Sequence, residues 1–163
     1  MLPIYRIIFF SMFLTVHSTA GLALAASTGN PILAFMMGVL SHYFLDMIPH
    51  GDENIDKFLP NTMDFKLKVA IWATGDFLLV LVLWLTIFKA LILTYPVVFL
   101  SGALGAMAPD MLQGFSILFK LKILRLHEKF HNAAHRLLNN PVPFRYGIII
   151  QIAFFSGLLY QLF

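Results

Sequence analysis

The sequence of 163 residues contains no cysteine, and only 12% of its residues are charged. The absence of cysteine excludes disulfides, iron–sulfur clusters and thiolate zinc sites. Soluble domains carry about 25% charged residues, so this chain has too few charges to cover a surface that faces water. Any metal bound here must therefore be held by imidazole and carboxylate groups.

Hydrophobic residues fill the place of the missing charge, because they make up 60% of the chain. Soluble domains contain about 45–50% apolar residues. The composition excludes a soluble enzyme, a disordered tail and a nucleic-acid-binding module, and it indicates a polytopic membrane protein. We expect an all-α fold in one integral-membrane domain, residues 1–163. Its five transmembrane helices are predicted near residues 7–27, 32–49, 67–88, 96–118 and 144–163.

The basic residues predict the orientation of these five spans. All but one of the lysines and arginines fall on one side, and they are Arg6, Lys57, Lys66, Lys68, Lys120, Lys122, Arg125, Lys129, Arg136 and Arg145. Lys89 alone falls on the other side. The positive-inside rule then predicts a bacterial inner-membrane protein with a cytoplasmic amino terminus and an external carboxy terminus.

The first span also imitates a secretory signal peptide, because Arg6 precedes an apolar run that ends in the small residues 23–26. The same stretch is long enough to cross a bilayer and stay attached. Cleavage would remove His17, and intact-mass analysis distinguishes the two outcomes.

Five ionisable residues lie inside the predicted spans, where a charged group costs about 2.5–3.5 kcal/mol on insertion scales. They are His17, His42, Asp46, Asp76 and Asp110. A rise of about 1.5 Å per helical residue places all five in the cytoplasmic half of the membrane. We expect them to face one shared, water-accessible cavity. The alternative is that each forms a hydrogen bond that holds two helices together.

The most specific local pattern joins His42, Asp46 and His50. His42 and Asp46 are four residues apart, so their side chains share one face of a helix and can bind one metal. Pro49 disfavours helix at the residue before it, so His50 is expected to leave the helix axis and turn back toward the pair. The alternative is a histidine hydrogen-bonded to a neutral aspartic acid.

A second group of histidines lies on a predicted interfacial amphipathic helix near residues 120–139, on the cytoplasmic side. One face carries Leu126, Phe130, Ala133, Ala134 and Leu137; one flank carries Lys122, Arg125, Lys129 and Arg136; the other carries His127, His131 and His135. Such a helix lies with its apolar face in lipid and its basic flank toward phosphates. His131 and His135 are the predicted catalytic histidines, unless all three only sit at the level of the headgroups.

The run Gly-x-x-x-His-x-x-x-Asp-x-x-x-His, from Gly38 to His50, resembles the bacterial inner-membrane-bound metal-dependent hydrolases. It is also similar to a motif of the zinc-dependent phospholipases C, which are all-α enzymes. An early histidine, a Pro-Asp element and later histidines complete the site in those families; His17, residues 108–110 and residues 127–135 look like these parts. Where those hydrolases continue with Asp and His, this chain has Leu112 and Gln113, and the order of the elements differs.

We therefore expect a membrane-embedded, metal-dependent hydrolase of a phosphoester, such as a lipid headgroup, at the cytoplasmic leaflet. A divalent metal, Zn²⁺ by preference, is expected on His17, His42, Asp46 and Asp110, with Asp76 bridging or orienting a ligand. The predicted proton carriers are His50, His131 and His135.

The expected partners are membrane lipids and an anionic or phosphate-bearing small substrate, without nucleic acid. The sequence does not determine the oligomeric state. Two alternatives use the same residues differently. One is a transporter that conducts protons or metal ions, and the other is a structural or partner-binding membrane protein.

Overall fold

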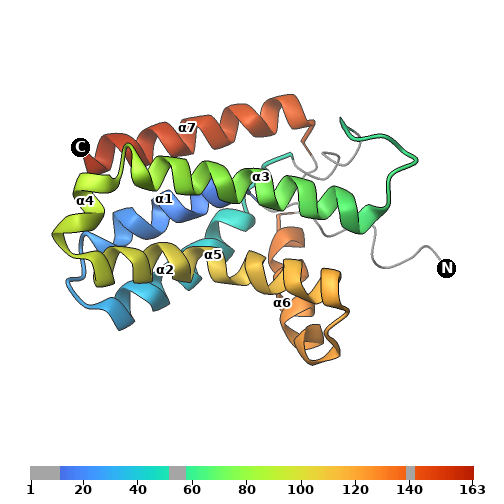
Figure 1. Ribbon diagram of the computed structural model, residues 1–163, viewed down its shortest axis with the longest axis horizontal. Coiled ribbons are helices and arrows are strands. Elements are labelled where there is room, and N and C mark those ends of the chain that lie inside the picture. The colour runs from blue at the N-terminus through green and yellow to red at the C-terminus, as the bar shows by residue number, and fades with distance from the viewer. Residues whose placement is uncertain (1–11, 52–57, 139–141) are drawn as a thin grey trace.

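The computed structural model describes residues 12–51, 58–138 and 142–163, and these residues form helices and no strand. The elements are α1 (Leu14–Ala25), α2 (Pro31–Asp46), α3 (Phe65–Leu85), α4 (Lys89–Thr94), α5 (Pro96–Phe119), the 3-10 turn η3 (Lys122–Leu124), α6 (Arg125–Arg136) and α7 (Phe144–Leu162). Helices α1, α2, α3, α5 and α7 run along the long axis of the molecule, whereas α6 lies across one end (Figure 1).

The all-α prediction is confirmed, and α1, α2, α3, α5 and α7 overlap the five predicted segments in order. The short helix α4 was not predicted. Residues 7–11 of the first predicted span, together with Arg6 and Lys57, lie outside the described residues. Within the described part of the chain, α3 alone is both long and apolar enough to cross a membrane by its own length and mean hydropathy; α1 and α2 are apolar but shorter.

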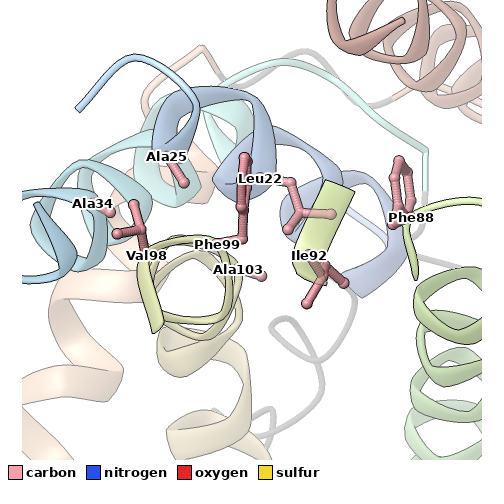
Figure 2. Close-up of a cluster of buried hydrophobic side chains, with 8 residues drawn as sticks. All are labelled: Leu22, Ala25, Ala34, Phe88, Ile92, Val98, Phe99 and Ala103. Atoms are coloured by element: carbon pink, nitrogen blue, oxygen red, sulfur yellow. The ribbon is translucent and has the colours of Figure 1, made fainter. Parts of the chain in front are cut away.

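The larger of two buried apolar clusters lies at the end of the bundle that carries α4. Figure 2 shows the cluster, which consists of Leu22, Ala25, Ala34, Phe88, Ile92, Val98, Phe99 and Ala103. These side chains come from α1, α2, α5 and the segment around α4. The buried residues His42, Asp46 and His131 lie instead where α2, α5 and α6 meet.

Polar and apolar residues are distributed inside out compared with a soluble protein. Many large apolar side chains face outward, for example Ile32 at 73% exposed and Phe44 at 66% exposed, both on α2. Histidines and a glutamine are fully enclosed instead, including His17 and His42 at 0% and Gln151 at 2%. Exposed apolar surface of this kind is typical of a face that contacts a membrane or a protein partner.

Two glycines of α5 set how closely the helices around the polar end approach. A Cβ atom at Gly105 would overlap the backbone of Phe35 in α2, and one at Gly102 would overlap the backbone of Gly21 in α1. Small residues at such contacts let helix backbones come together without side chains between them. The close approach brings Asp110, two turns further along α5, next to the polar residues of α1 and α2.

Candidate metal centre

Three helices bring four potential metal ligands to one point. Helix α2 contributes His42 and Asp46, α5 contributes Asp110 and α6 contributes His131. Each offers one ligand atom, and the four atoms all lie within 4.8 Å of one another. The expected face-sharing of His42 and Asp46 is therefore present, and the other two ligands come from residues far away in the sequence.

The spacing of these atoms matches the edges of a tetrahedron around a metal. The Nε2 atom of His42 is 2.9 Å from Asp46 Oδ2, 3.7 Å from Asp110 Oδ1 and 3.0 Å from His131 Nε2. The Nε2 atom of His131 is 3.3 Å from Asp46 Oδ2 and 3.2 Å from Asp110 Oδ1. Zinc bonds of 2.0–2.2 Å in tetrahedral geometry separate neighbouring ligand atoms by about 3.4 Å. The observed distances between these ligand atoms run from 2.9 to 3.7 Å, on both sides of that value.

Hydrogen bonding alone does not satisfy this group. The Nδ1 atom of His42 donates to the backbone carbonyl of Ala106 at 2.9 Å, so the neutral ring presents the lone pair of Nε2 to its neighbours. His131 Nε2 has at most one hydrogen for three close acceptors. Asp46 Oδ2 accepts no hydrogen bond from the described residues, although Asp46 is only 1% exposed. A cation at the centre of the group would satisfy all these lone pairs together.

The electrostatic surroundings of His131 also favour a cation at the centre of this group. Burial alone would lower the pKa of His131, but the adjacent carboxylates of Asp110 and Asp46 outweigh burial and raise the pKa to about 9. The two carboxylates therefore favour positive charge at this position, whether a proton or a metal ion supplies it.

The remaining predicted histidines gather around Asp46. His17 lies with Nε2 at 3.1 Å from Asp46 Oδ1 and 3.8 Å from Asp110 Oδ2. His135 lies with Nε2 at 3.1 Å from Asp46 Oδ2, and His50, His135 and Asp46 form a second group of potential ligand atoms. The structure thus brings together seven of the eight predicted site residues, which are His17, His42, Asp46, His50, Asp110, His131 and His135.

Asp76, predicted as a bridging or orienting residue, binds backbone instead. Its carboxylate accepts hydrogen bonds from the N–H groups of Leu14 at 2.6 Å and Thr15 at 3.3 Å, at the first turn of α1. The first N–H groups of a helix have no partner within the helix, and a negative charge there also interacts favourably with the helix dipole. Asp76 therefore explains why α1 can begin at Leu14, inside the predicted first span.

Substituting Asp76→Ala is expected to lower the stability of the protein by about 1–3 kcal/mol, because it leaves buried N–H groups of α1 without an acceptor. The bound metal content is expected to remain unchanged. Thermal unfolding in detergent and metal analysis of the same sample test both points. Asp76→Asn, which keeps one carbonyl oxygen, is the matched control with a smaller loss. Loss of metal at unchanged stability of the metal-free protein would show that Asp76 is a ligand.

Several residues that orient the site were not predicted. The Ala106 carbonyl fixes the ring of His42, and Gln151 in α7 donates from Nε2 to the His50 carbonyl at 3.1 Å while its Oε1 accepts from the Phe13 N–H at 2.9 Å. Gln151 had a signal in the sequence, since it is an amide in an otherwise apolar segment. A backbone carbonyl has no such signal. His127 donates from Nε2 to the Pro109 carbonyl at 2.9 Å and lies outside both ligand groups.

Comparison of the chain with models of protein families, with curated proteins and with solved structures found no match. The chemical role of the site is therefore inferred from its ligand atoms and their spacing. Imidazole nitrogens and carboxylate oxygens at these spacings are a ligand set for a divalent metal ion.

Proposed function

We propose that the protein is an integral-membrane, metal-dependent hydrolase that cleaves a phosphoester at the cytoplasmic leaflet. The observation that carries this proposal is the buried group of His42, Asp46, Asp110 and His131, whose atoms have metal-ligand spacing. Zinc is the proposed ion, because it accepts mixed nitrogen and oxygen ligands in tetrahedral geometry. When bound, such an ion lowers the pKa of its water toward 7 and neutralises charge on a phosphoryl oxygen.

The proposed membrane placement is supported by the apolar exterior of the bundle. Besides α3, with 21 residues, α5 has 24 and α7 has 19. At about 1.5 Å per residue these helices are about 28–36 Å long, which is close to the thickness of a bilayer core. The shorter α1 and α2 carry buried polar residues of the site, including His17, His42 and Asp46. We therefore retain five spans as the proposed arrangement.

The distribution of charge supports the proposed orientation. The start of α3 with Lys66, the end of α5 next to Lys120 and the start of α7 with Arg145 all lie at the end of the bundle that carries α6 (Figure 1). Lys89 begins α4 at the opposite end. By the positive-inside rule, the α6 end and the metal centre face the cytoplasm of a bacterial inner membrane.

The exposed residues of α6 support the proposal that the substrate carries a phosphate and lies at the membrane surface. The apolar residues Leu126 and Phe130 are exposed, at 78% and 68%, as the predicted apolar face requires. His131 and Ala134 face the protein, so the prediction that Ala134 belongs to the lipid-facing side was wrong. Lys122, Arg125, Lys129 and Arg136 extend along the same segment. An interfacial helix with an apolar face and basic residues attracts anionic lipid headgroups. The proposed substrate phosphate would thereby be held close to the histidines of α6.

The proposed reaction is tested with protein purified in detergent and assayed against mixed micelles of anionic and zwitterionic phospholipids. Products are identified by mass spectrometry. We expect cleavage of at least one phosphoester, its loss after chelation and its return with Zn²⁺. Absence of any tightly bound metal would instead favour a structural role, and metal flux into proteoliposomes without product would favour a transporter.

A further inference from the structure

We propose that Asp46 bridges two metal ions, and that the second ion is held by Asp46, His50 and His135. This inference rests on the proposed function and adds to it, because it assigns the water that attacks the phosphoester to the second ion. Asp46 is the single residue common to the two ligand groups that the described residues form.

The geometry around Asp46 supports a bridging role. Its carboxylate is 1% exposed and lies against four imidazole rings, with three Nε2 atoms close to Oδ2 and His17 Nε2 close to Oδ1. A tetrahedral ion in the first group already has four ligands, from His42, His131, Asp110 and Asp46, so His135 has no place on that ion. A carboxylate has lone pairs for two cations, and paired metals in hydrolytic sites lie about 3.5–4 Å apart.

His50 is prepared to act as a ligand of the second ion. Its Nδ1 donates to the carbonyl of Ile48 at 2.6 Å, and this bond fixes the orientation of the ring beside Asp46 and His135. The ring lies at 5.4 Å from the ring of His135, measured between centroids, in an edge-to-face arrangement. A backbone carbonyl also orients the ring of His42 in the first group, where Nδ1 of His42 donates to the Ala106 carbonyl.

Helix α7 fixes the backbone at His50. Gln151 donates to the His50 carbonyl, and Gly147 lies so close to that carbonyl that a Cβ atom there would overlap it. His50 is only 7% exposed even though it follows the end of α2. A residue in a connecting segment is usually mobile, and these contacts hold this one in place beside Asp46.

The two groups differ in a way that separates their roles. The first offers four protein ligands, so a water joins that ion only by displacing one of them or by raising the coordination number to five. Among the described residues the second has three, the number that catalytic zinc sites combine with a bound water. The side chain of His135 is also 16% exposed, whereas that of His42 is 0% exposed. The second ion would therefore lie toward the solvent and the basic helix, where a substrate phosphate can reach it.

The test is the number of zinc ions per chain in the purified full-length protein, after dialysis against a zinc-buffered solution. We expect two ions in the unaltered protein, one in His135→Ala and one in His50→Ala, with phosphoester hydrolysis lost in both variants. The matched control is His127→Ala on the same helix, which should retain two ions. Circular dichroism in detergent verifies that each variant keeps its helices.

A measurement on the unaltered protein complements the variants. Loaded with Mn²⁺, it should give the electron paramagnetic resonance spectrum of two exchange-coupled ions, and a spectrum of isolated ions would overturn the bridge. If the unaltered protein bound a single zinc ion, and this ion survived His135→Ala but was lost in His42→Ala, the second site would be overturned while the proposed hydrolase would stand. A protein that binds no zinc would overturn both.

Discussion

Replacing Asp46 by alanine is expected to abolish tight metal binding and hydrolysis together, while the helical content remains. Asp46 is the residue around which all the other ligands gather, and without it Asp110 is the one carboxylate left in either group. Four-ligand zinc sites provide about 10–16 kcal/mol of binding free energy. An even share of one ligand is about 3 kcal/mol, which corresponds to at least a 100-fold loss of affinity.

Asp46→Asn gives the sharper version of this experiment, since the amide has the same shape but is a much weaker ligand. Metal analysis by mass spectrometry should find both variants depleted of metal under conditions that saturate the unaltered protein. Asp46→Asn with full metal content and full activity would contradict the role of this carboxylate as a ligand.

Replacing His42 by alanine is expected to lower the rate of hydrolysis by about 100-fold or more at limiting zinc, from the same loss of one ligand. His42 Nε2 lies 2.9 Å from Asp46 Oδ2, and its ring is oriented by the Ala106 carbonyl. The rate is measured at a fixed, buffered zinc concentration, and excess zinc should restore part of it. Partial rescue by metal separates a lost ligand from a lost fold.

His127→Ala is the matched control for His42→Ala. His127 stacks on His131 with ring centroids 5.6 Å apart, yet its Nε2 is used on the Pro109 carbonyl and it belongs to neither ligand group. Its rate should stay within a few-fold of the unaltered protein. Equal loss of rate in the two variants would mean that both histidines act only through packing.

Much of this site could be predicted because polar residues in an apolar chain carry a strong signal. A histidine or aspartate inside a predicted span must have a partner, since burying a charge in oil is costly. His17, His42 and Asp110 were identified in this way. The spacing of four residues then placed Asp46 beside His42 on the same helix face.

Tertiary structure decided what the sequence left open. Asp76 carried the same signal as Asp110, but the unpaired N–H groups at the start of α1 use it instead. Hydropathy does not fix how a helix is rotated, and it does not show where a helix begins inside an apolar segment. His131 was predicted as a proton carrier; its place within the four-ligand group follows from the way α6 packs across the ends of α2 and α5.

The central claim is that imidazoles and carboxylates from separate helices surround a common metal ion. X-ray absorption at the zinc edge of the purified, zinc-loaded protein tests it most directly. The geometry predicts a first shell of nitrogen and oxygen atoms at about 2.0–2.2 Å, with the outer-shell scattering of several imidazole rings. A shell without imidazole scattering, or zinc that washes away during purification, would contradict the claim.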